Sequence, residues 1–268
     1  MAQSTIESYL SSIRQYHLVN GMNPPIIRTD IVKSVLGGCG NKHKSENVSV
    51  RYPCTINLIK LLKAELKGSN IESSQKLVIF SAATIAFFGG LRMNELLSKG
   101  HIAYDPKYTL LRSDITIHKT MLDGKSVEVL SLDIKHSKTG KKSEIVDIYS
   151  NNESICPVKV AKKLLKSTRE LPKDYPFMSD KKGKLLTLKD FNSHLHKLLD
   201  SKLKGCKGRV SGHSFRAGLT SLFGSLGYSE QELKAFGRWS SRAFSLYIKN
   251  GRTNRREIAK QASQLTTI

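Results

Sequence analysis

The sequence contains few cysteines, and none of them pair at short spacing. They are Cys39, Cys54, Cys156 and Cys206. No Cys-x-x-Cys motif occurs, so neither a zinc site nor a disulfide framework is predicted. We therefore expect reduced thiols and an intracellular protein, nuclear if the chain is eukaryotic. No metal or cofactor is expected, and the sequence also lacks a glycine-rich GxxxxGK phosphate loop.

Long apolar segments are missing as well. The most apolar stretch, 77–91, is interrupted by Ser81, Thr84 and two glycines, and it is too short to span a bilayer. It is typical of a buried helix. The first residues lack a basic region followed by an apolar run, so no signal peptide is predicted. These absences argue against a membrane protein or a secreted one.

Acidic residues are scarce relative to basic ones. The 268 residues include 44 Lys and Arg against 22 Asp and Glu, a formal net charge of +22. Such an excess favours a polyanionic partner, and nucleic acid is the first expectation. An acidic membrane surface is the second candidate, and a basic protein without such a partner is the third. The charges are spread along the whole chain, which indicates a folded basic face.

Hydrophobic spacing and capping residues predict a mainly helical chain with a small antiparallel three-stranded sheet. The expected helices cover 4–19, 29 or 30 to 36, 56–68, 73–88, 91–97, 157–167, 188–203, a segment from about 214, 229–237 and a segment from 240 or 241. The expected strands are 108–118, 127–134 and 144–149, with a hairpin turn at Asp123–Gly124. Residues 1–50 are expected to form a short helical part with a linker, and 51–268 the main domain.

His213 and Arg216 lie three residues apart near the predicted start of a helix. One helical turn places both on the same side, and the backbone N–H groups of a helix N-terminus favour an anion such as phosphate. Taken alone, the pair is more often a core histidine beside a solvated charge. The rest of the chain has to decide between these interpretations.

Five motifs, taken together in chain order, resemble the tyrosine recombinase (phage integrase) family. They are GGLRMNELL at 89–97, HSKTG at 136–140, HSFR at 213–216, FGRWSS at 236–241 and LYIK at 246–249. GRWSS followed by a tyrosine looks most like integrases of eukaryotic mobile elements, such as DIRS-type retrotransposons and Cryptons. The resemblance covers 52–250 well and 1–50 in part. Trp239 departs from the histidine that many relatives have at that position.

The resemblance implies the tyrosine recombinase catalytic-domain fold for 51–268 and a partial helical core-binding, or DNA-clamp, domain for 1–50. The implied catalytic residues are Arg92, Lys138, His213, Arg216, Trp239 and the nucleophile Tyr247. Such an enzyme is a site-specific recombinase or integrase that cleaves and rejoins double-stranded DNA through a 3′-phosphotyrosyl intermediate. It would act as a homo-tetramer on paired DNA sites.

The residue types suit that chemistry. Two arginines can hold the non-bridging oxygens of a phosphodiester while negative charge grows on them. His213 can take the proton of the tyrosine, and Lys138 can give one to the departing 5′-oxygen. An indole N–H can hydrogen-bond a phosphate oxygen but cannot carry a proton, so Trp239 is expected to position the phosphate.

Several alternatives remain open from the sequence. Lys135, Lys141 and Lys142 compete with Lys138, and the whole turn can instead be a basic contact to a DNA backbone. The short N-terminal part is consistent with a trimmed chain, a piece of a polyprotein or a degenerate element. The chain can accordingly be a catalytically silent DNA-binding remnant. A type IB topoisomerase, which shares the tyrosine chemistry, ranks third.

Overall fold

The computed structural model describes residues 3–25, 30–32, 34–38, 52–101, 103–135, 143–151, 153–203 and 210–239. The chain divides into two compact units, Met1–Val50 and Arg51–Ile268. Among the described residues, no helix combines the length and the apolar character needed to cross a bilayer.

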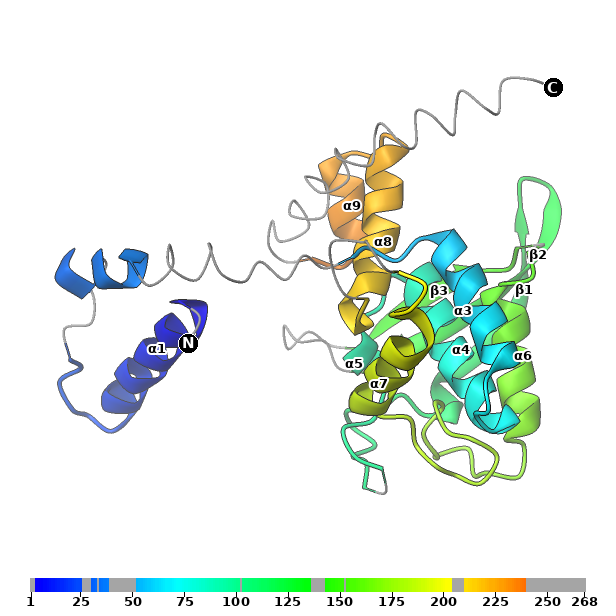
Figure 1. The fold of residues 1–268 in the computed structure, drawn as a ribbon, viewed down its shortest axis with the longest axis horizontal. Helices are drawn as coiled ribbons and strands as arrows, with labels where there is room; N and C mark the ends of the chain where they lie inside the picture. The colour runs from blue at the N-terminus through cyan, green and yellow to red at the C-terminus, as the bar shows by residue number, and fades with distance from the viewer. Residues whose placement is uncertain are drawn as a thin grey trace. The chain divides into compact units, whose positions relative to one another are not determined.

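The first unit contains the helix α1, Gln3–Val19, which begins one residue before the predicted bound (Figure 1). Its end coincides with a turn in which Gly21 has a φ of 67°, a conformation that favours glycine. Tyr9, Ile13 and Tyr16 leave much of their surface exposed. Residues 30–32 and 34–38 are also helical. That this unit is a core-binding domain stays a prediction.

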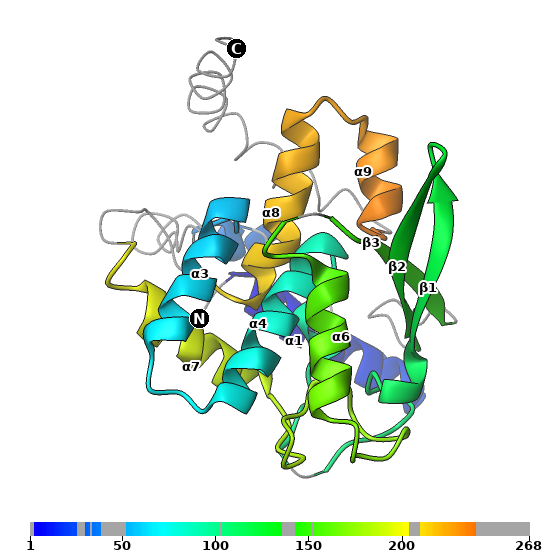
Figure 2. The same ribbon diagram turned by 90° about the vertical axis from the view of Figure 1, so that its right-hand side faces the viewer.

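The second unit is helix-rich and carries one small sheet (Figures 1 and 2). Its helices are α3 Ile56–Gly68, α4 Ser73–Phe88, α5 Met93–Leu96, the 3-10 turn η1 Arg112–Asp114, α6 Pro157–Ser167, α7 Leu188–Leu199, α8 Gly212–Ser225 and α9 Glu230–Phe236. The bounds of α3, α4 and α6 agree with the sequence-based prediction.

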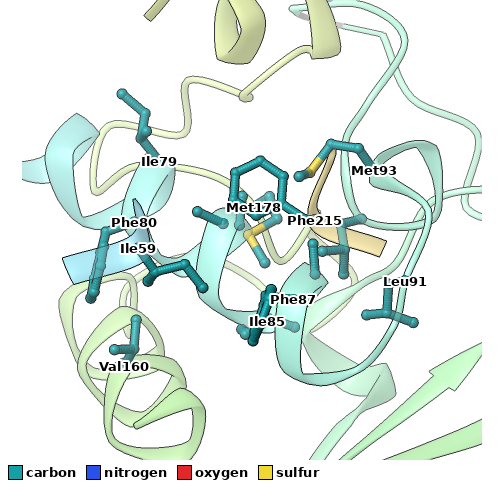
Figure 3. Packing of buried hydrophobic residues seen from close by; sticks show 14 of the residues in the cluster. Ile59, Ile79, Phe80, Ile85, Phe87, Leu91, Met93, Val160, Met178 and Phe215 are labelled. Atoms are coloured by element: carbon teal, nitrogen blue, oxygen red, sulfur yellow. The ribbon is translucent and has the colours of Figure 1, made fainter. Parts of the chain in front are cut away.

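Helix α4 forms the centre of the core. Every residue from 78 to 87 is buried, so the helix is covered on all sides by α3, α6 and α8. Figure 3 shows Ile85 and Phe87 of this helix packed among Ile59, Leu91 and Phe215, which come from other parts of the chain. The stretch 77–91 is therefore the buried helix that its composition predicts.

The sheet has the order β1-β2-β3 and is antiparallel throughout. Its strands are β1 Ile115–Leu122, β2 Lys125–Ile134 and β3 Glu144–Tyr149. Asp123 and Gly124 form the predicted two-residue turn, with φ values of 49° and 74°. Helix α6 packs against β2 and β3.

Several predicted bounds around the sheet and α7 were wrong. The hairpin reaches further than predicted, since the first strand ends at Leu122 instead of His118 and the second begins at Lys125 instead of Val127. The first strand begins at Ile115 instead of Tyr108, because the backbone N–H of Arg112 donates to the carbonyl of Tyr175 and breaks the strand pairing. Helix α7 ends at Leu199 instead of Leu203. At the start of β1 and the end of α7, a contact with residues distant in sequence or a local turn overrides an apolar pattern that continues further.

Candidate active site

The break between α4 and α5 presents Arg92. Gly90 has a φ of 56°, and a Cβ at that position would lie 3.0 Å from the ring of Phe236 in α9. A Cβ at Gly89 would lie 2.8 Å from Ile148 in β3. The two glycines therefore let the chain turn sharply between the sheet and α9, and Arg92 follows that turn directly.

Glu95 holds Arg92 at the start of α5. Its carboxylate accepts the backbone N–H of Arg92 at 2.8 Å and the Nη1 of the same residue at 3.0 Å. The side chain of Glu95 is 4% exposed and that of Arg92 is 22% exposed. The guanidinium thus has one edge fixed to a buried carboxylate and part of its surface available to a ligand.

Helix α8 carries the second arginine. It begins at Gly212, two residues earlier than predicted, because Ser211 and Ser214 form the reciprocal contacts of a helix start. A Cβ on Gly218 would lie 1.8 Å from the carbonyl oxygen of Cys54. Only glycine allows α8 to approach the backbone at Cys54 this closely. The backbone N–H of Cys54 donates to Ser214 at 2.8 Å, which keeps the two segments together.

Arg216 lies inside the protein, 5% exposed, and touches the turn that follows α9. Its Nη2 donates to the carbonyl oxygen of Gly237. Its guanidinium carbon lies 4.5 Å from the ring centroid of Trp239, a cation–π contact. Helix α9 is started by the predicted capping box, in which Ser229 and Glu232 cap one another. Arg216 is therefore joined to the FGRW motif at two points.

Arg238, a residue that is not among the predicted catalytic residues, completes the connection. Its Nη2 lies 2.7 Å from the Oε2 of Glu95, and its Nη1 lies 3.8 Å from Glu144 at the start of β3. Arg92 is thus linked through Glu95 and Arg238 to the same turn that Arg216 contacts. The only signal in the sequence was an arginine inside the GRW step.

The remaining predicted residues fall into two groups. His213 lies in the first turn of α8 and is exposed, whereas Arg216 one turn later is buried. The backbone N–H of the neighbouring Gly212 donates to the side chain of Asn192 in α7 at 2.9 Å. Lys138 and Tyr247 lie outside the described residues. Their predicted roles therefore stay predictions.

A small, open pocket lies between α4, α7 and the 180–186 segment. His194 and Asp190 line it, and none of the predicted catalytic residues do. Burial lowers the pKa of His194, so the neutral imidazole is favoured.

No protein-family model matches the chain, and neither does any curated protein. Solved structures do. The Tn1549 transposon integrase in complex with transposon right end DNA is 14% identical with a TM-score of 0.55, covering 98% of this chain and 80% of that one. The XerH site-specific recombinase bound to a palindromic difH substrate is 14% identical with a TM-score of 0.55, covering 82% of this chain.

A complex of FLP recombinase with a Holliday junction is also similar, with 14% identity, a TM-score of 0.51 and coverage of 79% of this chain. This chain spans about half the length of the XerH and FLP chains, 54% and 51%. At this identity the likeness concerns the fold. The helix-rich unit with its small antiparallel sheet has the fold of the tyrosine recombinase catalytic domain, as predicted.

Proposed function

We propose that the protein is a site-specific DNA recombinase or integrase that cleaves and rejoins DNA strands through a 3′-phosphotyrosyl intermediate on Tyr247. The observation that carries the proposal is the connection between Arg92 and Arg216. These two arginines come from distant segments and meet the same turn, Arg92 through Glu95 and Arg238, and Arg216 directly. The fold supports this proposal, as does the net charge of +22.

The chemistry follows from a weak nucleophile. A phenol has a reference pKa of ~10, so its oxygen attacks a phosphodiester only where charge is stabilised around it. Arg92 and Arg216 hold the non-bridging oxygens as negative charge accumulates in the transition state. The Oη of Tyr247 bonds to phosphorus, and the bond from phosphorus to the 5′-oxygen breaks.

Two protons have to move during this step. His213, exposed at the first turn of α8, accepts the phenolic proton. Lys138 donates a proton to the departing 5′-oxygen. Trp239 positions the phosphate through its indole N–H. The ring stacks on the Arg216 guanidinium, which keeps these two groups in one orientation.

Rejoining reverses the step. The phosphotyrosyl bond keeps the energy of the phosphodiester, so a free 5′-hydroxyl of a second duplex can attack it without ATP. Strand exchange then requires two duplexes held together, and we propose a homo-tetramer on paired sites. Residues 1–50 would clamp the DNA as a partial core-binding domain. Likeness to DIRS-type and Crypton integrases, with a nuclear location, belongs to the same proposal.

A nicked suicide substrate tests the proposal. The full chain is incubated with a pool of duplexes that are randomised around a nick, so that cleavage releases a short fragment and traps the covalent complex. We expect a denaturation-resistant protein–DNA adduct, and sequencing the trapped DNA identifies the site. The adduct should disappear in Tyr247→Phe and persist in Tyr228→Phe, a control tyrosine that is 49% exposed between α8 and α9.

Other outcomes separate the alternatives. DNA binding without any adduct would mean a silent remnant instead of an enzyme. An adduct accompanied by relaxation of supercoiled plasmid, but no exchange between paired sites, would favour a type IB topoisomerase. An adduct that survives Tyr247→Phe would assign the nucleophile to another residue.

A further inference from the structure

Arg238 adopts a conformation that arginine rarely takes. Its φ is 54°, in the left-handed region, where a side chain with a Cβ is strained. Its side chain is nevertheless only 9% exposed. Strained backbone that persists at a site next to candidate catalytic groups often serves those groups. Here the turn directs the guanidinium inward, toward Glu95.

Charge explains what that contact can do. Glu95 by itself would neutralise Arg92, and a neutral pair attracts a phosphate weakly. Arg238 adds a second guanidinium to the same buried carboxylate, at 2.7 Å from its Oε2. The group of three therefore keeps one net positive charge, which Glu144 offsets only in part because it lies 3.8 Å from Arg238 and is 42% exposed to solvent. Arg92 is the more exposed of the two arginines, at 22% against 9%, so it is the one that a ligand can reach.

Arg238 also reaches the other segments of the candidate site. Its Nη1 lies 3.8 Å from Glu144, the first residue of β3, which follows the HSKTG segment in the chain. Its neighbours Gly237 and Trp239 are the residues that contact Arg216. Among the described residues, its Nε and Nη1 have no hydrogen-bond acceptor. A buried ion pair of this kind is weak evidence for a contribution to stability, so a role in the arrangement of the site has to be considered.

We propose that Arg238 is a positioning residue for strand cleavage. By neutralising and anchoring Glu95, it orients Arg92 toward the scissile phosphate and fixes the turn that bears Trp239 against α5. This inference rests on the proposed function, because it assigns the arrangement a purpose in that reaction. It adds a residue to the site that belongs to this chain and carries no phosphate contact of its own.

A first experiment needs no DNA. Trp239 is the only tryptophan of the chain, so its fluorescence reports the turn directly. Arg238→Met should shift the emission to the red and increase quenching by acrylamide, because the turn loses its link to α5. Glu95→Gln should have a similar effect, and the double variant should change no more than either single one. Arg169→Met, at an arginine side chain that is 75% exposed, is the matched control and should leave the emission unchanged.

A second experiment measures cleavage of the trapped suicide substrate in a single turnover. Arg238→Met should slow cleavage about a hundredfold, the scale of a small misplacement of a reacting group, while DNA affinity changes little. Arg238→Lys, which can still donate to Glu95, should recover part of the rate. Arg238→Met combined with Arg92→Ala should lose less than the product of the two single losses, because part of the effect of Arg238 passes through Arg92.

The outcomes are distinguishable. If the wild type forms no adduct, the proposed function fails, and the fluorescence experiment alone decides whether Arg238 links the turn to α5. If the wild type cleaves and Arg238→Met cleaves as fast, the positioning role is refuted. Losses from Arg92→Ala and Arg238→Met that simply multiply in the double variant would also refute it, because Arg238 would then act independently of Arg92.

Discussion

Gly218→Ala should destabilise the second unit through one backbone contact. The added Cβ would lie 1.8 Å from the Cys54 carbonyl oxygen, whereas real Cβ contacts stay above 3.0 Å, so α8 and the Cys54 backbone must separate by about 1 Å. Relieving overpacking against backbone costs about 3 kcal/mol. The hydrogen bond from Cys54 to Ser214, 2.8 Å long, would be lost at a further cost of about 1 kcal/mol.

The helix itself offsets part of this cost. Alanine is favoured over glycine in a helix interior by about 1 kcal/mol, which leaves a net loss near 3 kcal/mol. For a unit of this size the melting temperature should fall by roughly 6–12 °C. Circular dichroism of thermal unfolding measures it. Arg216 lies on the same helix, so cleavage of DNA should also fall at temperatures where the variant is still folded.

Gly68→Ala provides the matched control. Gly68 is the last residue of α3, and nothing lies within 4 Å of the position its Cβ would take. This substitution should be neutral or stabilise by up to about 1 kcal/mol, because alanine restricts the unfolded chain. A Gly218→Ala variant that melts with the wild type would refute the close packing of α8 on Cys54.

Four further predictions concern the site and its surroundings. Glu95→Gln should lower the free energy of unfolding by about 3 kcal/mol in urea titrations, because the positive charges of Arg92 and Arg238 would lose the carboxylate that both contact. Lys138→Ala should slow cleavage about 10²- to 10⁴-fold, the usual contribution of a general acid. A substrate with a 5′-bridging sulfur, whose leaving group needs no proton, should restore the cleavage rate of Lys138→Ala. The control variant Lys141→Ala should cleave the ordinary substrate at the wild-type rate. Trp239→Phe, which lacks the N–H donor, should slow cleavage about 10²-fold. Trp239→His, which keeps an N–H donor, should cleave at close to the wild-type rate. His194 has a folded pKa below its unfolded value of 6.5, so stability should be lost as the pH falls through that value; urea unfolding of His194→Gln should show a smaller loss.

The candidate site depends on residues near the end of the described chain. Glu95 in α5 holds Arg92 through a hydrogen bond to its backbone N–H. Glu95 gains its second arginine partner, Arg238, only when the turn after α9 packs against α5. Figure 2 shows α9 beside α8, with its lower end near the sheet. A change in that packing would displace both arginines at once.

Local features of the chain were sufficient for most elements. The capping box at Ser229, the hairpin turn at Asp123–Gly124 and the glycine after Phe88 each act over a few residues, so their sequence pattern predicts their structure. The candidate fold could be predicted from motif order, and the neighbouring structures confirm it. The roles of Lys138 and Tyr247 stay predictions.

Tertiary structure decided what no local pattern contains. Arg216 is buried and His213 exposed although they lie one turn apart, because His213 stands in the first turn of α8 whereas every residue from 214 to 220 is enclosed by the rest of the unit. Arg238 was missed for the same reason: its importance depends on Glu95, which is far away in sequence and reaches it only after folding. Charges are paired through space, and the sequence alone determines which charges exist but not which of them meet.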